Sequence, residues 1–483
     1  MEVKIKNKGE EKKYFLSPGE TLFEMLIRQE NYFLSFCGGR GMCGKCKIQF
    51  LSPPPMPHAE ERKFLTPEEL RKGIRLACLA RPKEDCVISI LFEEEKIQEM
   101  DLEQRIVASY IPAYVDQEQK DFSESQMVAI DLGTTTIVLQ LLEIASGKIC
   151  SERRVLNPQR TWGADVLSRM EASIQGKREV LRDRTIHLLE QEISSLTKDE
   201  NISIVIAANT VMEHILMGFD VSGLSVYPFL PVSLEQMQIT IGCYHATLMP
   251  GISGFVGADI MAGIYALHMH QSEEINLLLD LGTNGEMVIG NRDKLLATAT
   301  AAGPAFEGGT LASVQGTDMI AQTAKMLQKG ILDETGLMEE PYFHEGYQVK
   351  EFSLQQADIR NLQMAKAAIH AGVEVLLEQM QVRIERIGQV FLAGGFGYYL
   401  DVECANRIGL LPKGMQQKTK AVGNTSLYGA YLYGKAQWQA KERGIEDWHN
   451  TPKEIIQIKN SIKTINLAEQ ESFEGMYIAA MHF

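Results

Sequence analysis

The sequence predicts a small α+β unit at the N-terminus followed by a much larger α/β domain that is built from two similar halves. Three observations support this division. Four of the eight cysteines lie within the first 78 residues, a polar and charged stretch covers residues 93–125, and the tetrapeptide Asp-Leu-Gly-Thr occurs twice, beginning at Asp131 and at Asp280. A chain of 483 residues is also longer than the roughly 250–300 residues at which a single core stops growing.

Composition and charge exclude several classes of protein. Hydrophobic residues make up 45% and charged residues 23%, which is typical of a folded globular chain. The formal net charge of -15 argues against nucleic-acid binding, which needs clustered Lys and Arg. The N-terminus lacks the apolar segment of a secretory signal, and there is no run of about 18 apolar residues. We therefore expect no membrane partner, no nucleic-acid partner and a cytoplasmic location.

The first 92 residues have the pattern of a compact β-rich unit. Residues 3–5, 13–16, 47–51 and 87–92 are strand-like, and the spacing of Leu22, Met25 and Leu26 predicts a helix over residues 21–28. A proline-rich run at residues 53–57 ends regular structure after the third strand. We expect this unit to span residues 1–92 and residues 93–125 to form a linker.

The N-terminal unit carries a cysteine motif with the spacing of an iron–sulfur site. Cys37, Cys43 and Cys46 form C-x5-C-x2-C, and Cys78 supplies a distant fourth thiol. Plant-type [2Fe–2S] ferredoxins also use three close cysteines and a distant one, with one fewer residue in the first gap. The same loop holds four glycines (Gly38, Gly39, Gly41 and Gly44). Glycines allow positive φ, so that backbone N–H groups can point at the sulfurs.

Two other interpretations of these cysteines stay open at this point. Four thiolates can also hold structural zinc, although zinc ligands usually come as two short pairs and Cys78 is solitary. A thioredoxin-like CxxC needs a βαβ context that is absent around Cys43 and Cys46. The other four cysteines (Cys86, Cys150, Cys243 and Cys404) are isolated in sequence, and we expect them to be buried, inert thiols.

The two Asp-Leu-Gly-Thr segments predict a nucleotide site in a duplicated domain over residues 126–483. Each segment ends one apolar strand and precedes another, at residues 137–142 and 286–289, and long helical patterns follow. A tight turn after a strand bares N–H groups and hydroxyls that bind anions. The predicted phosphate-binding residues are Gly133, Thr134, Thr135 and Thr136 in the first copy and Gly282, Thr283, Asn284 and Gly285 in the second.

The carboxylates of these segments are predicted to serve catalysis. We expect Asp131 and Asp280 to face each other across a cleft and to hold Mg²⁺ through waters, with Glu286 orienting the attacking water. A third element, residues 390–397, is a strand that runs into a glycine turn. There Gly394, Gly395, Phe396 and Gly397 are predicted to let the adenosine of ATP lie flat against the backbone.

These motifs, in this order, resemble the phosphate-1, phosphate-2 and adenosine motifs of the acetate and sugar kinase, Hsp70 and actin (ASKHA) superfamily. Together with the N-terminal cysteine motif, the chain resembles the reductive activators of corrinoid-dependent proteins over nearly its whole length. Further segments that carry this resemblance are Asn157-Pro158-Gln159, Gly163-Ala164-Asp165-Val166, Gly257-Ala258-Asp259, Ala301-Ala302-Gly303-Pro304-Ala305-Phe306-Glu307-Gly308 and Asp358-Ile359-Arg360. The resemblance implies an α+β ferredoxin-like (β-grasp) domain followed by an α/β duplicated actin/Hsp70/sugar-kinase-like domain.

The resemblance also implies a function. Such activators use ATP and Mg²⁺ to pass one electron from a [2Fe–2S] cluster to the Co(II) of a corrinoid protein, which restores Co(I) for methyl transfer. The implied partners are a corrinoid protein and an upstream electron donor such as a ferredoxin or flavodoxin reductase system, and we expect a homodimer because that is the commonest symmetric assembly. Larger family members have a long linker and a separate middle domain, whereas here only residues 93–125 separate Phe92 from Gln126.

Three other functions remain compatible with the motifs. A small-metabolite kinase with a redox-sensing ferredoxin domain would transfer phosphate to a metabolite. An electron activator of a dehydratase-type enzyme shares the kinase-like fold but lacks a ferredoxin domain. An Hsp70-like binding module would carry a structural cluster that is not reduced and reoxidised.

Overall fold

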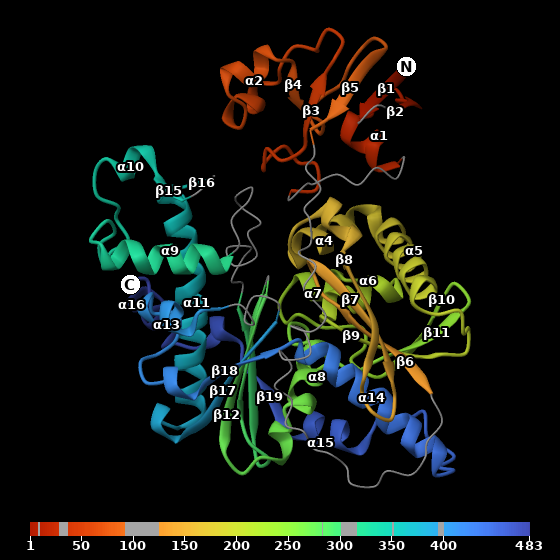
Figure 1. Cartoon of the computed structure of the whole chain (residues 1–483), viewed down its shortest axis with the longest axis vertical. Coiled ribbons are helices and arrows are strands. Elements are labelled where there is room, and N and C mark those ends of the chain that lie inside the picture. Colours follow the sequence, from red (N-terminus) through yellow and green to blue (C-terminus); the bar gives the residue numbers. More distant parts are fainter. Residues whose placement is uncertain are drawn as a thin grey trace.

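The computed structural model describes residues 1–7, 10–28, 37–91, 125–282, 284–300, 316–349, 352–394 and 400–483. These residues form three principal sheets, one in the N-terminal unit and two that lie side by side below it (Figure 1). Within this part of the chain, no helix combines the length and the apolar character needed to span a membrane.

The N-terminal unit is a five-stranded sheet in the order β2-β1-β5-β3-β4, with β1 and β5 parallel at its centre. Its strands are β1 (Glu2–Asn7), β2 (Glu10–Phe15), β3 (Lys47–Phe50), β4 (Ile74–Leu76) and β5 (Cys86–Ile90), and its helices are α1 (Leu22–Arg28) and α2 (Pro67–Arg71). The face of α1 expected from the sequence is buried, with Leu22, Met25 and Leu26 all at 0% exposure. The four predicted strands are present, and β4 is a strand that the sequence pattern did not indicate.

The first half of the larger domain is a six-stranded sheet in the order β10-β11-β9-β6-β7-β8. Its strands are β6 (Gln126–Leu132), β7 (Thr136–Glu143), β8 (Ile149–Leu156), β9 (Ser203–Ala208), β10 (Met237–Ile241) and β11 (Tyr244–Leu248), and its helices are α4 (Val166–Ala172), α5 (Arg178–Leu196), α6 (Thr210–Met217), α7 (Ser222–Ser225) and α8 (Ala258–Ala266). Strands β6, β7 and β8 are antiparallel to their neighbours, β9 pairs with β6 in parallel, and β11 pairs with β9 in parallel.

The second half repeats this arrangement. Its sheet has the order β18-β17-β12-β13-β14-β19, again with three antiparallel strands followed by two parallel ones. The strands are β12 (Ile275–Leu281), β13 (Gly285–Gly290), β14 (Leu295–Thr300), β17 (Ile387–Ala393), β18 (Thr419–Gly423) and β19 (Ile462–Thr464). The series β8-β7-β6-β9-β11 thus corresponds to β14-β13-β12-β17-β18, and the predicted duplication is confirmed.

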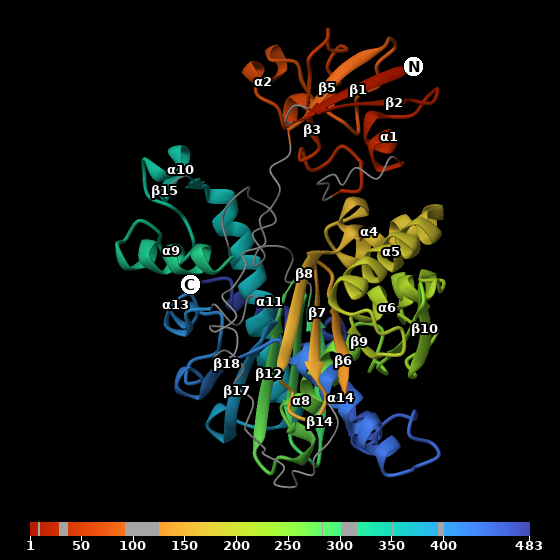
Figure 2. The ribbon, with the colours of Figure 1, turned by 45° about the vertical axis from the view of Figure 1, so that its right-hand side comes forward.

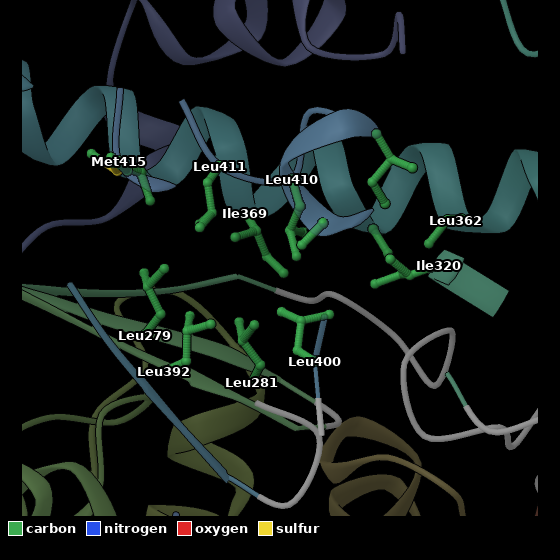
Figure 3. Packing of buried hydrophobic residues seen from close by; sticks show 14 of the residues in the cluster. Leu279, Leu281, Ile320, Leu362, Ile369, Leu392, Leu400, Leu410, Leu411 and Met415 are labelled. Atoms are coloured by element: carbon green, nitrogen blue, oxygen red, sulfur yellow. The ribbon is translucent and has the colours of Figure 1, made fainter. Parts of the chain in front are cut away.

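The helices of the second half pack around its sheet. They are α9 (Gly316–Gln328), α10 (Tyr342–Glu345), α11 (Gln356–Met380), α13 (Val402–Arg407), α14 (Thr425–Glu442), α15 (Lys453–Ser461) and α16 (Phe473–Ala479), and a hairpin of β15 (Tyr347–Val349) and β16 (Phe352–Leu354) precedes α11. Figure 3 shows Leu279, Leu281 and Leu392 of the strands facing Ile369 of α11.

The two halves are joined by a close crossing of α8 and α14, which lie next to each other between the two sheets (Figures 1 and 2). A Cβ atom placed on Gly429 of α14 would lie 2.2 Å from the backbone oxygen of Ala262 in α8. One buried cluster includes strand residues of both halves, such as Met127 and Leu278, together with residues of both helices. The crossing therefore fixes the distance between the two predicted strand-end carboxylates.

The Gly429→Ala variant should lower the free energy of unfolding by about 1–3 kcal/mol, because the added methyl group overpacks a helix crossing against backbone atoms that cannot rotate away. Denaturant unfolding measures this loss. The matched control is Gly475→Ala in α16, where nothing lies within 4 Å of the new methyl group. Equal stability of the two variants would contradict this account of the crossing.

Candidate functional site

The four predicted cluster ligands come together as two pairs of thiols. The Sγ atoms of Cys46 and Cys78 lie 3.2 Å apart, and the thiols of Cys37 and Cys43 hydrogen-bond to each other. The backbone N–H of Met42 also donates to Cys37 Sγ at 3.4 Å. Cys37, Cys46 and Cys78 are buried and Cys43 is partly buried.

This pairing distinguishes between the two metal sites that the sequence left open. A single zinc ion takes all its ligands around one point, whereas a dinuclear cluster takes two protein ligands on each iron. Among the described residues no group of three or more His, Cys, Asp or Glu side chains is arranged to hold one metal ion. Two separate pairs of thiols therefore suit a [2Fe–2S] cluster better than zinc.

Each pair contains one thiol that ionises easily and one that does not. The hydrogen bond from Cys43, helped by backbone N–H groups, lowers the pKa of Cys37 to about 4, and the pKa of Cys43 is raised by the same partner. In the second pair, the hydrogen bond with Cys46 lowers the pKa of Cys78, and the pKa of Cys46 is raised in turn. Binding of iron by all four thiolates would thus release the remaining protons.

The loop wraps around the thiols as its glycines predict. The φ angles are +61° at Gly38, +85° at Gly39, +74° at Gly41 and +67° at Gly44. At Gly44 a side chain is excluded twice, because φ is positive and an added Cβ would lie 2.7 Å from Phe64.

The other four cysteines differ from the prediction that all would be buried. Only Cys86 is buried, while Cys404 is partly exposed and Cys150 and Cys243 are exposed. Cys150 lies in β8 and Cys243 lies in the turn between β10 and β11, at positions where the side chain faces outward from the sheet edge or turn. Isolation in sequence did not reveal this, because burial of a small thiol depends on tertiary packing.

Asp131 and Asp280 lie at the ends of β6 and β12, one in each half, but their surroundings differ. Asn424 Nδ2 donates to Asp131 Oδ2 at 2.7 Å, and Ser426 Oγ donates to Asp131 Oδ1 at 2.9 Å. Both donors stand at the start of α14, which belongs to the second half. Both oxygens of Asp131 are therefore bound by the opposite half of the domain.

Asp280 has acidic neighbours. The register of β12 and β13 sets Asp280 opposite Glu286, and Glu286 is buried. Burial, followed by the charges of Asp259 and Asp131, raises the pKa of Asp280 to about 8. Burial and then the charges of Asp259 and Asp280 raise the pKa of Glu286 well above its usual value. These carboxyl groups remain ionised together only if a cation lies near them.

Asp259 is a carboxylate of this site to which the sequence analysis assigned no role. It stands in the first turn of α8, and its pKa is raised to about 7 by burial and by the charge of Asp131. The corresponding turn of the second half holds Asn424 and Ser426. The start of α14 thus presents hydrogen-bond donors to Asp131, and the equivalent start of α8 presents the carboxylate of Asp259 to Asp280. Asp259 follows β11, and Asn424 follows the corresponding strand β18, but this equivalence can be recognised only once the two halves are aligned.

A fifth carboxyl group, Glu213 of α6, is fully buried beside Asp259. Neither of its carboxylate oxygens has a hydrogen-bond partner within the described ranges. Burial and the charge of Asp259 raise the pKa of Glu213 well above its usual value. The group is accordingly expected to be protonated at neutral pH in the free protein.

The predicted phosphate turns follow these strands as expected. Gly133, Thr134 and Thr135 form the turn between β6 and β7, with Thr136 opening β7, and Gly282 and Asn284 lie between β12 and β13, with Gly285 opening β13. Thr283, Gly395, Phe396, Gly397 and the segment 301–308 lie outside the described residues. Gly394 is described, and a Cβ added there would lie 2.6 Å from Asp280 Oδ1. The start of the third motif therefore meets the second strand-end carboxylate.

Family models match three consecutive parts of the chain. A 2Fe-2S iron-sulfur cluster binding domain matches residues 5–83, a RACo middle region matches residues 127–272, and the C-terminal domain of RACo, the ASKHA domain, matches residues 274–313 and 310–483. The middle region is thus present and coincides with the first half of the duplicated domain. The expected departure from larger members, in which a middle domain would be missing here, is wrong.

Two curated proteins and one solved structure are similar to this chain in agreement with the family models. The chain is 28% identical over 378 residues to the corrinoid activation enzyme RamQ of Eubacterium limosum, and the alignment covers 63% of each protein. It is 23% identical over 289 residues to the [Co(II) methylated amine-specific corrinoid protein] reductase of Methanosarcina barkeri, covering 48% of this chain and 51% of that one. The alignments thus span less than two thirds of these relatives. A solved reductive activator for corrinoid, iron-sulfur protein has the same fold, with a TM-score of 0.65 at 24% identity, over 100% of this chain and 98% of that one.

Replacing one member of a thiol pair should remove the cluster. After anaerobic iron loading, Cys43→Ser should lose the visible absorption of the protein and most of its bound iron, because one iron is left with a single thiolate. Cys243→Ser, at an exposed thiol far from the pairs in sequence, is the matched control and should keep both. Iron content and the visible spectrum measure the effect, and loss of the cluster in both variants would count against the assignment.

The buried carboxyl groups of Asp259 and Asp280 should make the stability of the protein depend on pH in one direction. Because the folded pKa values of Asp280 and Asp259 are raised to about 8 and about 7, the folded state holds more protons than the unfolded state above pH ~4. Without a cation, the unfolding midpoint temperature should therefore fall as pH rises toward 8. Mg-ADP should raise the midpoint more at pH 8 than at pH 6, and Asp259→Asn should reduce the pH dependence. A midpoint that rises between pH 6 and pH 8 without Mg-ADP would contradict this.

Proposed function

Because the chain belongs to the RACo family, we propose that it is an ATP-dependent reductive activator of a corrinoid protein. The observation that carries the proposal is that one chain combines two thiol pairs suited to a [2Fe–2S] cluster with duplicated halves whose Asp131, Asp259 and Asp280 lie close enough for their charges to interact. When bound, the cluster would supply one electron, which would convert Co(II) of the partner to Co(I). An external one-electron donor would then reduce the oxidised cluster again.

The domain division predicted from the sequence forms part of this proposal. Residues 1–92 would carry the cluster, residues 93–125 would connect, and residues 126–483 would bind and hydrolyse ATP. The two halves of the last segment meet near residues 272–274, where the two RACo family models also meet.

The two strand-end aspartates have unequal roles in this proposal. Asp131 already accepts two hydrogen bonds from Asn424 and Ser426, so its main task is to hold the first half against the start of α14. Asp280, with Asp259 beside it, has acidic neighbours that call for a cation. Mg²⁺ prefers oxygen ligands and usually keeps several of its waters, so it can be held by one or two carboxylates together with phosphate oxygens.

The groups around Asp280 would prepare the attack of water on the terminal phosphate. N–H groups of the turns at Gly133 and Gly282 would bind phosphate oxygens. Glu286 remains the residue proposed to orient the water, and Asp259 is a second carboxylate within its electrostatic reach. The burial of Asp280 and Glu286 keeps bulk water away from their carboxyl groups, which strengthens their electrostatic interactions.

Energetics explain why ATP is needed. Moving an electron uphill costs about 2.3 kcal/mol per 100 mV, and Co(II) of a corrinoid accepts electrons poorly compared with a ferredoxin cluster. Binding can shift the cobalt couple only by its different affinity for the two oxidation states. We propose that the activator binds the Co(II) form preferentially and alters cobalt ligation, and that ATP turnover resets the complex. An identical cobalt potential in the free protein and in the complex would rule this mechanism out.

The test mixes the reduced protein with a Co(II) corrinoid protein and follows the visible spectrum with and without Mg-ATP. Co(I) should form only when nucleotide is present. Asp280→Asn should keep the cluster spectrum but lose the nucleotide-dependent step, and Cys43→Ser should lose both, while Cys243→Ser should behave as the parent protein. Transfer of phosphate from ATP to a metabolite, with no Co(I), would favour a kinase instead.

A further inference from the structure

The loop that carries the cluster ligands, residues 37–46, lies against the first half of the larger domain. We call residues 157–171 of that half the seat. A Cβ added to Gly38 would lie 2.4 Å from the backbone oxygen of Trp162, so the two backbones are in direct contact. Arg40 forms an ion pair with Glu171 of α4, and its Nη2 atom lies 3.4 Å from Ser168 Oγ. In Figure 1 the N-terminal unit accordingly stands beyond α4 and α5.

These contacts suit an association that can be made and broken. The Arg40 and Glu171 side chains are 38% and 46% exposed, and exposed ion pairs contribute little to stability. A second polar contact runs from Arg184 Nη2 to the backbone oxygen of Ile27 at 2.8 Å, and Ile27 also packs partly against the core of the first half. The described polar contacts thus join the first half both to the cluster loop, at Arg40, and to the end of α1, at Ile27.

The other end of the seat is bonded to the first phosphate turn. Asn157 is buried, and its backbone N–H donates to Thr135 O at 2.9 Å while its Nδ2 donates to Gly133 O at 2.9 Å. Both acceptors belong to the turn after Asp131. Asn157 thus fixes two carbonyl groups of the turn that is predicted to bind phosphate.

The same side chain also starts the helix that touches the cluster loop. Asn157 Oδ1 accepts from the N–H of Gln159 at 2.9 Å and caps the 3₁₀ helix Pro158–Trp162. Gln159 Nε2 in turn donates to Thr185 Oγ1 at 2.8 Å in the buried interior. Five residues after Asn157, Trp162 meets Gly38. One short rigid segment therefore joins the phosphate turn to the cluster loop.

We propose that Asn157 is a positioning residue that couples the nucleotide turn to the docking of the cluster loop. This inference rests on the proposed function, since it takes Gly133 and Thr135 as part of the phosphate site. Nucleotide orders the turn, the ordered turn fixes Asn157 and the helix after it, and the cluster loop then docks more firmly. Linkage requires the reverse effect as well, so docking raises nucleotide affinity by the same factor.

The iron-loaded, full-length protein provides two readouts that do not depend on electron transfer. The coloured cluster quenches nearby indole emission, and the Trp162→Phe variant identifies the share due to Trp162. On adding Mg-ADP, Trp162 emission should fall, and amide hydrogen exchange in residues 37–46 should slow. No change in either signal under saturating nucleotide would overturn the proposal.

Asn157→Asp separates coupling from folding. The carboxylate can still cap the N–H of Gln159, but it cannot donate to Gly133 O. This variant should still bind Mg-ADP at saturation while its Trp162 and exchange responses are lost. A response equal to that of the parent protein would show that Asn157 does not transmit the signal.

Charge exchange tests the docking contact at the surface, where folding is not at risk. Arg40→Glu and Glu171→Arg should each reduce the docked fraction about two- to fivefold, the range expected for an exposed pair, and the double exchange should restore it. Failure of the double variant to restore docking would count against this contact. Co(I) formation measured on the same samples keeps the two proposals apart: Co(I) without a docking response refutes the coupling, and a docking response without Co(I) refutes the proposed function.

Discussion

The constraint on which the site of the larger domain depends is the repulsion among buried carboxyl groups that the fold brings close together. Asp131, Asp259, Asp280, Glu286 and Glu213 come from five separate elements, and those with acidic neighbours have raised pKa values. In the described part of the chain, Asp131 accepts a side-chain hydrogen bond at each of its two oxygens. A protein that keeps such a cluster at neutral pH must supply protons or a cation, and the position of Asp280 beside two glycine-containing turns makes a hydrated cation with phosphates the natural occupant.

The close crossing of α8 and α14 determines which groups meet at each strand-end aspartate. Because Gly429 lets the two helices touch along their backbones, the first turn of each helix reaches the strand end of the opposite half. Duplicated halves would by themselves produce an equivalent pair of sites. The equivalence is broken because α14 begins with Asn424 and Ser426, whereas α8 begins with Asp259 at the corresponding place. Asp131 is therefore held by hydrogen bonds between the halves, while Asp280 has an acidic neighbour and suits a charged ligand.

Several features could be predicted from the sequence because they depend on local pattern. The glycine-rich cysteine loop, the strand-end aspartates and the repeated strand–turn–strand units each lie within a few consecutive residues, and the structure contains all of them. The roles of Asp259, Glu213 and Asn157 could not be found in this way, since each depends on a partner that folding brings close, such as Thr135 for Asn157. The exposed Cys150 and Cys243 were misjudged for the same reason. The middle region was not recognised as such because it coincides with the first half of the duplicated domain and is not a separate insertion.

A device that couples two chemistries needs a stiff connection between them, and the route through Asn157 has this property. Flexible connections transmit little, because a bound ligand can shift an equilibrium only through a difference in interaction between two states. Asn157 and Gln159 are both buried and use their side-chain donors within the protein, so a displacement of the phosphate turn cannot be absorbed there without breaking a hydrogen bond. The Arg40 contact at the far end is exposed and weak by comparison. Strain that begins at the nucleotide would therefore be relieved at the cluster loop, which is the place where a change of position can control when the electron leaves.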